Sequence, residues 1–111
     1  MEISFKNAKL QKKCNDFKKA SKEWGEPMAK KIRQRLDELE AAPNLEAMRY
    51  LPGRCHELKG NRKNQLSIDL VAQWRLLFKP SDKDVILKND GGMDWNAVKK
   101  ITILGVEDTH E

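Results

Sequence analysis

Two histidines and several cations are the side chains in this 111-residue sequence that are suited to acid–base chemistry on a phosphodiester. Histidine has the unperturbed side-chain pKa nearest neutrality, so His56 and His110 could each accept or donate a proton at pH 7. Metal-free cleavage of RNA needs a base for the 2′-hydroxyl proton, a donor for the leaving 5′-oxygen and cations for the developing phosphorane charge. Lys59 and Arg75 could supply those cations, so the four residues form a candidate catalytic constellation.

His56 lies in a segment with a local excess of positive charge. Between positions 54 and 79 there are six basic and two acidic residues, which leaves a local charge of +4. The basic residues are Arg54, Lys59, Arg62, Lys63, Arg75 and Lys79. Such a surface gives salt-dependent affinity for any nucleic acid without reading its sequence. The alternative is an ordinary solvated charged surface, which composition alone favours.

Composition and the absence of other motifs limit the function further. The chain carries a net charge of +5, has the length of one domain and lacks the sequence patterns of metal sites, Gly-rich phosphate loops and serine triads. It has no long apolar run and no signal peptide at its beginning, so we expect a soluble cytoplasmic protein. Its two cysteines, Cys14 and Cys55, are expected to be reduced thiols that pack as small buried apolar residues.

The N-terminal part is predicted to fold as a short edge strand at residues 3–5 and a helical hairpin. Asn7 is a suitable N-cap for the first helix, and Gly25 should end it. One face of this helix carries Leu10, Cys14, Phe17, Ser21 and Trp24 at helical spacing. The second helix should run from Glu26 to Pro43, with Met28, Ile32, Leu36 and Leu39 as its apolar stripe.

The C-terminal part is predicted to be mainly strands. Apolar residues alternate with polar ones at 66–70 and 74–78, and the short link between these runs requires an antiparallel hairpin. Further strands are expected at 55–58, 85–87 and 101–106, with a short helix at 44–50, polar turns at 60–64 and 89–92, and a helical turn from Asp94. Helices laid on one face of this antiparallel-rich sheet would make an α+β fold whose other face is free to bind a ligand.

Three motifs, in this order, resemble one known family. They are the segment Leu51-Pro52-Gly53-Arg54-Cys55-His56-Glu57-Leu58-Lys59-Gly60-Asn61-Arg62-Lys63, the strand Trp74-Arg75-Leu76-Leu77-Phe78 and the ending Glu107-Asp108-Thr109-His110. Together they resemble the HigB-type toxins of the RelE/ParE superfamily over nearly the whole chain. The residues around Gly91-Gly92 look like an insertion that a subgroup of these toxins carries.

The resemblance implies a RelE-like microbial RNase fold that cuts mRNA in the decoding site of the 30S ribosomal subunit, with no cofactor. His56, Lys59, Arg75, Asp108 and His110 match family positions that bind or cleave mRNA, with Asp108 expected to orient His110. Thr109 stands where relatives commonly have tyrosine, and threonine cannot stack on a base, so activity could be weakened or shifted. Arg54, Arg62, Lys63 and Thr109 complete the expected RNA-binding set.

The resemblance also implies an antitoxin partner with a helix-turn-helix fold, whose complex with the toxin binds operator DNA. Two rival functions stay open at this point. ParE-type relatives inhibit DNA gyrase without cutting RNA, and fold alone does not fix function. A degenerate toxin that acts as a binding or regulatory module is the second rival, and Thr109 is the feature that favours it.

Overall fold

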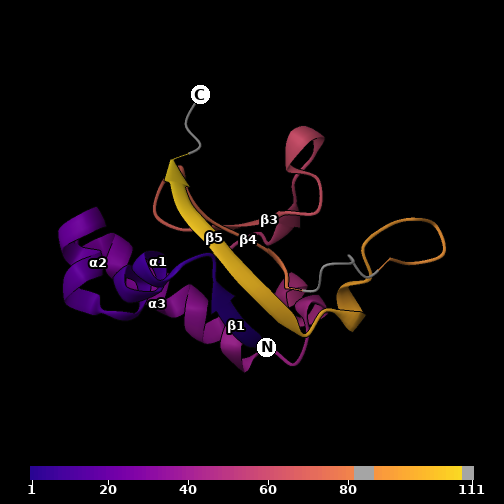
Figure 1. The fold of residues 1–111 in the computed structure, drawn as a ribbon, viewed down its shortest axis with the longest axis horizontal. Helices are drawn as coiled ribbons and strands as arrows, with labels where there is room; N and C mark the ends of the chain where they lie inside the picture. The colour runs from indigo at the N-terminus through magenta and orange to yellow at the C-terminus, as the bar shows by residue number, and fades with distance from the viewer. Residues whose placement is uncertain (82–86, 109–111) are drawn as a thin grey trace.

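The computed structural model describes residues 1–81 and 87–108 and confirms the α+β class (Figure 1). The helices are α1 (Ala8–Asn15), α2 (Phe17–Trp24) and α3 (Glu26–Ala41), with 3₁₀ turns η1 (Leu45–Tyr50), η2 (Gly60–Arg62) and η3 (Trp95–Ala97). The strands are β1 (Glu2–Phe5), β2 (His56–Glu57), β3 (Leu66–Asp69), β4 (Trp74–Pro80) and β5 (Lys100–Asp108). The predicted strand at 85–87 falls largely outside the described residues, of which Leu87 makes a single antiparallel bridge to Met93.

The first predicted helix begins at Asn7 as expected but is broken in two at Asp16. Asn7 caps α1, with its side-chain oxygen accepting a hydrogen bond from the Leu10 N–H at 2.9 Å. Asp16 has extended backbone angles, and its carboxylate caps α2 by accepting from the Lys19 N–H at 3.1 Å. Aspartate favours N-cap positions, and here this local preference outweighs continuation of the helix. Phe17, predicted to face the core, is consequently 48% exposed.

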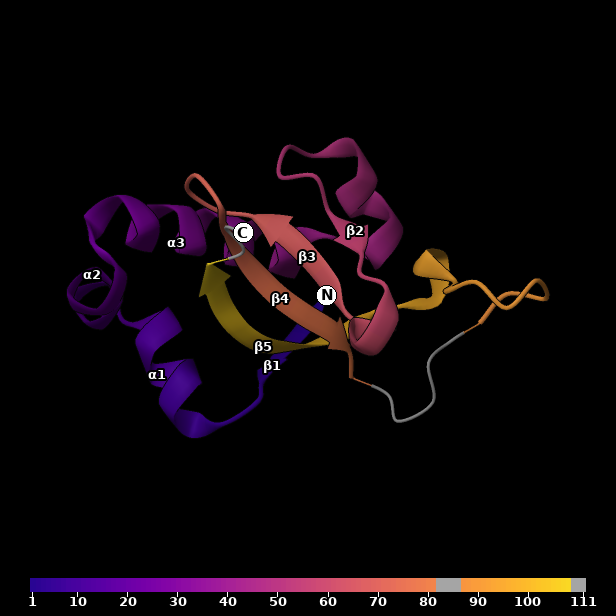
Figure 2. The same cartoon turned by 90° about the horizontal axis from the view of Figure 1, so that it is seen from above.

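Helix α3 supplies most of the helical side of the core. It lies along the sheet, while α1 and α2 gather at one end of the molecule (Figures 1 and 2). Gly25 adopts φ +92°, a conformation that side chains other than hydrogen rarely allow, and so lets the chain turn from α2 into α3. The predicted stripe of α3 is confirmed: Met28, Ile32, Leu36 and Leu39 are all buried.

The sheet has the order β1-β5-β4-β3-β2. β1 pairs with β5 in parallel, and the other three pairings are antiparallel, including the predicted β3–β4 hairpin. In that hairpin Asp69 lies directly opposite Arg75, and β2 adds His56 opposite Ser67. β2 is an edge strand of this sheet, as β1 is.

The two faces of the sheet have different roles because side chains alternate along a strand. Leu66, Ile68, Leu76 and Phe78 lie at 0% exposure in the core that α3 shares. The opposite face, which we call the open face, carries His56, Ser67, Asp69, Arg75 and Leu77. Figure 2 looks onto the sheet with α3 on its far side. Sequence analysis predicted that the sheet face away from the helices could bind a ligand, and the open face is that face.

The predicted helical turn after Asp94 is confirmed. The Asp94 carboxylate caps the turn η3 by accepting from the Asn96 N–H at 3.2 Å. Trp95 is 3% exposed, and its indole N–H donates to Glu57 at 3.0 Å, which ties η3 to β2. The Arg49 guanidinium lies 3.7 Å from the centre of the Trp95 ring, a cation–π contact that fixes the indole from the other side.

Both cysteines are free thiols. Cys14 is buried, as predicted, and Cys55 is partly buried against the core. Burial raises the pKa of the Cys14 thiol to about 11 and that of Cys55 to about 12. Since the thiolate is the reactive form, neither side chain is a nucleophile at neutral pH.

In the described parts of the chain, none of the helices has the length and apolar character needed to cross a membrane.

Candidate functional site on the open face of the sheet

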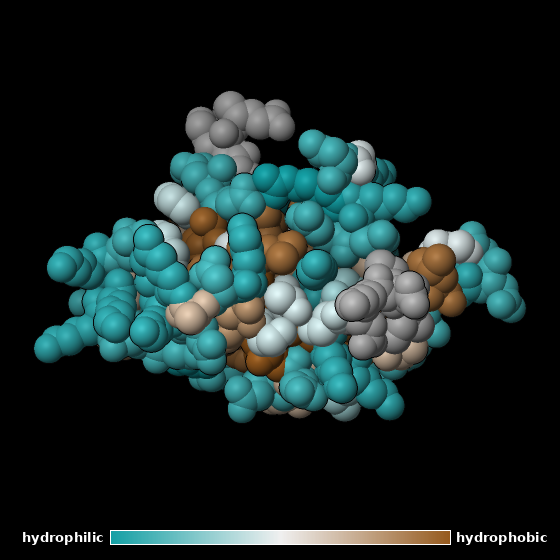
Figure 3. Space-filling model, viewed as in Figure 1, coloured by the Kyte–Doolittle hydropathy of each residue, from teal (hydrophilic) through white to brown (hydrophobic). Residues whose placement is uncertain are grey.

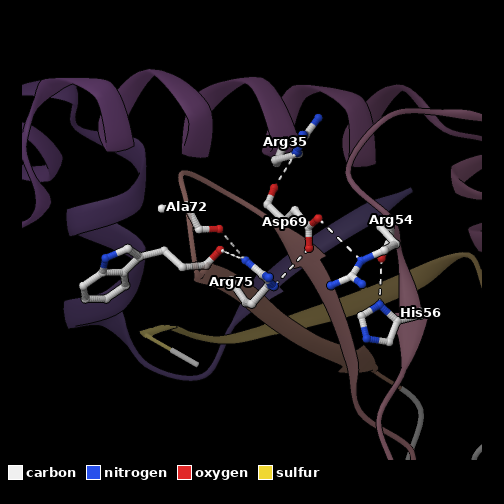
Figure 4. Close-up of polar contacts among 7 residues, drawn as sticks. Arg35, Arg54, His56, Asp69, Ala72 and Arg75 are labelled. Carbon is white, nitrogen blue, oxygen red and sulfur yellow. Dashed lines mark hydrogen bonds and ion pairs between the residues drawn. The ribbon is translucent and has the colours of Figure 1, made fainter. Parts of the chain in front are cut away.

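The carboxylate of Asp69 holds two arginines together on the open face. Arg75 Nε lies 3.0 Å from Asp69 Oδ1, and Arg54 Nε lies 3.6 Å from Oδ2 (Figure 4). Two guanidinium groups would repel each other at this spacing, and the carboxylate between them offsets that repulsion. The cluster of Arg54, Asp69 and Arg75 therefore keeps a net positive charge on one surface.

Arg75 is held rigidly by backbone groups as well as by Asp69. Its Nη1 donates to the carbonyl oxygens of Ala72 at 2.8 Å and Trp74 at 2.9 Å. Its side chain is 17% exposed, and Nη2 has no hydrogen-bond partner in residues 1–81 and 87–108. The protein thus fixes one edge of the guanidinium and leaves two N–H donors for an oxyanion.

Gly53 packs closely against β3 and helps to fix the backbone of Asp69. Gly53 adopts φ +113°, and a Cβ there would lie 2.9 Å from Ile68 and 3.0 Å from the Arg35 guanidinium. This close approach lets the Gly53 carbonyl accept from the Asp69 N–H at 2.7 Å. Arg35, which is buried, donates to the Asp69 carbonyl at 2.8 Å from the α3 side. The backbone of Asp69 is therefore fixed on both sides.

The hydrogen bond of His56 defines which ring nitrogen carries the proton. His56 Nδ1 lies 2.7 Å from the carbonyl oxygen of Arg54 (Figure 4). A carbonyl oxygen can only accept, so Nδ1 must be the protonated nitrogen. In the neutral ring Nε2 then has a free lone pair, which is the form a general base requires.

Asp69 is the residue of this cluster that the sequence-based site prediction omitted. Along the chain it is only one of two acidic residues in a basic segment. The signal that could have found it is the hairpin register: pairing the strands at 66–70 and 74–78 through the shortest link brings residue 69 beside residue 75. Opposite charges at facing positions of a hairpin stabilise each other.

Arg62, predicted to bind phosphate, is paired with a carboxylate. Its two terminal nitrogens donate to the two oxygens of Glu107 at 2.9 and 2.8 Å. η2 follows the edge strand β2, whereas Glu107 lies on β5, so the ion pair spans the open face above β3 and β4. On the same face, Ser67 and Leu77 are 2% and 1% exposed although they face away from the helices.

Glu107→Gln is expected to lower the free energy of unfolding by less than about 1 kcal/mol at pH 7, because both partners of the ion pair are partly exposed. Hydrogen bonds from Arg62 hold the pKa of Glu107 below its ordinary value of 4.5. Such a carboxylate stabilises the fold above that value and loses its contribution as the pH falls through the lowered pKa. The difference in urea unfolding between the variant and the parent should therefore be full at pH 7 and shrink steadily as the pH is lowered below 4.5.

Glu2→Gln is the matched control for this measurement. Glu2 lies 4.0 Å from Lys100 in an ion pair whose partners are more exposed. We expect no such pH-dependent difference for it. A stability difference for Glu107→Gln that stays constant with pH would contradict the assignment.

Three further predicted site residues, Lys59, Lys63 and Asp108, lie in the described part of the chain. Lys59 and Lys63 line a cavity of about 420 Å³ at the β2 edge of the sheet. Asp108 lies exposed at the end of β5, where its carboxylate accepts from Gln73 at 3.4 Å. Thr109 and His110 lie outside the described residues, so the predicted meeting of His110 with His56 and Arg75 stays a prediction. Within residues 1–81 and 87–108, no three His, Cys, Asp or Glu side chains form a group that could hold a metal ion.

Comparisons with known proteins show the family and the fold of this chain. A family model described as the RelE-like toxin HigB of type II toxin–antitoxin systems matches residues 3–90, a range that includes His56 and Arg75. Among solved structures, the chain is similar to a chain of the YoeB–YefM complex from Staphylococcus aureus, with a TM-score of 0.56 and 17% identity. The similarity covers 100% of this chain and 98% of that one, and at such identity it shows a shared fold. No curated protein matches the chain closely enough to count as a relative.

Proposed function

Because the chain belongs to the HigB-like family, the RelE-like toxins of type II toxin–antitoxin systems, we propose that it is an endoribonuclease that cuts mRNA on the ribosome. The predicted resemblance to HigB-type toxins is confirmed at the level of the family by a match over residues 3–90, which includes the motifs around His56 and Arg75 and ends before the C-terminal motif. The finer activity is our proposal, and the geometry of the open face supports it.

The observation that carries the proposal is that a candidate general base and a fixed cation lie on the same face of the sheet. His56 on β2 and Arg75 on β4 lie on either side of β3, and the ring of His56 has its free lone pair on Nε2. In the proposed reaction Nε2 takes the proton of the RNA 2′-hydroxyl, and the 2′-oxygen attacks the adjacent phosphorus. The two N–H donors on Nη2 of Arg75 stabilise the charge that develops on the phosphoryl oxygens.

The leaving 5′-oxygen needs a proton, and we assign its delivery to His110. The products are then a 2′,3′-cyclic phosphate and a free 5′-hydroxyl, so the proton lost by the 2′-hydroxyl is balanced by the one given to the leaving group. Asp108, at the end of β5, is proposed to orient His110 two residues later. Thr109 is proposed to contact the RNA by hydrogen bonding rather than by stacking.

The other basic residues are proposed to position the RNA backbone. Arg54 already lies beside Arg75 through Asp69, so a phosphate bound by one guanidinium is close to the other. Arg62 uses two of its five N–H donors on Glu107, so it has donors left for a phosphate, but the carboxylate offsets its positive charge. With so few protein groups at the reacting phosphate, the ribosome is proposed to supply much of the substrate orientation.

The direct test is incubation of the purified protein with ribosomes translating a defined mRNA, followed by mapping of the new 5′ ends. We expect cleavage of ribosome-bound mRNA and far slower cleavage of the same mRNA free in solution. A parallel supercoiling assay with DNA gyrase tests the ParE-like alternative. Inhibition of gyrase without any mRNA cleavage would overturn the proposal, and growth of cells that express the protein without an antitoxin would support a degenerate toxin.

An antitoxin with an acidic segment is the proposed protein partner. A groove of about 330 Å³ lies between α1, α2 and β5, with Lys6 and Lys9 beside Leu10 and Trp24, and its lining also holds the ion pair of Lys13 with Glu23 at 2.8 Å. β1 pairs with β5 only as far as Ile103, so residues 104–108 offer backbone groups on that side. Apolar surface gathers over β5 among hydrophilic side chains (Figure 3). An acidic amphipathic peptide matches this combination of charge, apolar floor and strand edge.

A further inference from the structure

The cavity lined by Lys59 and Lys63 lies at the β2 edge of the sheet, beside the open face. It occupies about 420 Å³ between the η2 turn and the loop that precedes η3. The two walls come from segments about thirty residues apart in the chain, which Figure 1 shows on the same side of the molecule. Its volume falls within the range of small-ligand sites, about 300 to 1000 Å³.

The walls of this cavity are fixed before any ligand binds. One wall begins at Glu57 of β2, whose carboxylate accepts from the buried Trp95 at 3.0 Å. The other is the loop at residues 87–93, closed by the Leu87–Met93 bridge and by the Lys88 N–H bond to the Gly92 carbonyl at 2.6 Å. The cavity is thus a preformed feature of the fold.

The chemistry of the lining suits a nucleotide. Lys59 and Lys63 have no ion-pair partner in residues 1–81 and 87–108, so both ammonium groups are available to a phosphate. Gly60 and Gly91 have positive φ, and a Cβ at either would meet no atom within 4 Å, so bare backbone borders open space there. Leu58 adds partly exposed apolar surface on which a base can lie, and the buried Met93 lies behind it in the lining.

The exposed carboxylate of Glu57 distinguishes RNA from an acidic peptide as the occupant. It would repel an acidic peptide, whereas it can accept hydrogen bonds from the amino group of a base. Adenine, cytosine and guanine carry such a group. Uracil offers one ring N–H between two carbonyl oxygens, which a carboxylate repels.

We propose that this cavity binds one nucleotide of the RNA strand next to the cleaved phosphate and selects against uracil there. The inference rests on the proposed nuclease function. Because β2 is an edge strand and successive side chains alternate, a strand bound at His56 can pass over that edge to Glu57. The loop at residues 87–93 would then be a specificity element rather than a passive insertion.

The test compares cleavage-site maps on translating ribosomes for the parent, Glu57→Gln and Lys63→Ala. The parent is expected to disfavour uracil by about fivefold or more at one fixed position beside the cut. Glutamine can still accept from Trp95 but can also donate to uracil, so Glu57→Gln should abolish that bias while cleavage continues. Lys63→Ala should lower cleavage at all sites by roughly tenfold. Lys30→Ala, an exposed lysine on α3, is the matched control and should change neither property.

Two outcomes overturn the inference while leaving the nuclease proposal intact: a parent with no bias against uracil, or a bias that Glu57→Gln leaves unchanged.

If the parent cuts no mRNA, the nuclease proposal fails, and a binding measurement then decides the inference. Backbone amide NMR signals of Gly60, Gly91 and Gly92 are followed with AMP and UMP as probes. Shifts that are larger with AMP, and lost in Lys63→Ala, support a nucleotide site. No shift at millimolar AMP, or shifts with an oligoglutamate peptide instead, overturns it.

Discussion

His56→Ala is expected to lower the rate of mRNA cleavage on translating ribosomes by roughly 10²- to 10⁴-fold, the usual contribution of a general base. The ring is held by the Arg54 carbonyl through Nδ1, which leaves Nε2 as the proton acceptor. Alanine removes both the acceptor and the held ring. Rates should be measured with saturating ribosomes, so that loss of the chemical step is separated from weaker binding.

His56→Asn distinguishes proton transfer from positioning. The asparagine amide can still donate to the Arg54 carbonyl, but it has no group that takes a proton at neutral pH. We expect it to be as impaired as His56→Ala. If His56→Asn kept most of the parental activity, the imidazole would serve only to shape the loop, and the proposed base would be wrong.

Arg75→Ala is expected to reduce cleavage by roughly 10²- to 10³-fold, the loss typical when one donor to a developing oxyanion is removed. The guanidinium is held by two backbone carbonyls and Asp69, so its free edge needs no reorganisation during the reaction. Arg75→Lys keeps the charge but loses the planar fork, and its activity should lie between those of the parent and the alanine variant. Single-turnover cleavage rates and urea unfolding should be measured together.

Arg33→Ala provides the matched control for Arg75. Arg33 lies on α3, is partly exposed and forms an ion pair with Asp37 at 3.0 Å. The variant therefore removes an arginine and an ion pair outside the open face. Its cleavage rate should equal that of the parent. Full activity in a folded Arg75→Ala protein would contradict the role assigned to this guanidinium.

Hydrophobic periodicity predicted most of the helices and strands, because residues buried on one face of an element recur at the structural period of that element. The stripe of α3 and the alternation at Leu66 and Phe78 both reach the core. The break at Asp16 was missed because a helical face continues across it, while the competing signal is one capping side chain. The strand of Glu2–Phe5 was predicted at the edge, but its parallel pairing with β5 depends on a partner nearly a hundred residues away.

The candidate site was predicted less completely, since the positive charge was counted along the chain and not in space. Arg54, Arg62 and Lys63 belong to one basic segment, yet the structure directs them to Asp69, to Glu107 and to the cavity at the β2 edge. A count of charge along the chain does not show which group each cation contacts. Asp69 is the partner of Arg54 and Glu107 is the partner of Arg62, and neither carboxylate stands out in the sequence.

The sequence by itself determined the class of fold, the family and the identities of the groups that could act on RNA. Hydrophobic periodicity and the order of a few chemically distinctive residues are local properties, and they can be read along the chain. Only the tertiary structure decided which nitrogen of His56 holds the proton, which edge of Arg75 is free and which cations are already paired. Those properties depend on carbonyls and carboxylates brought close by strand register and by one glycine at residue 53, which no local pattern specifies.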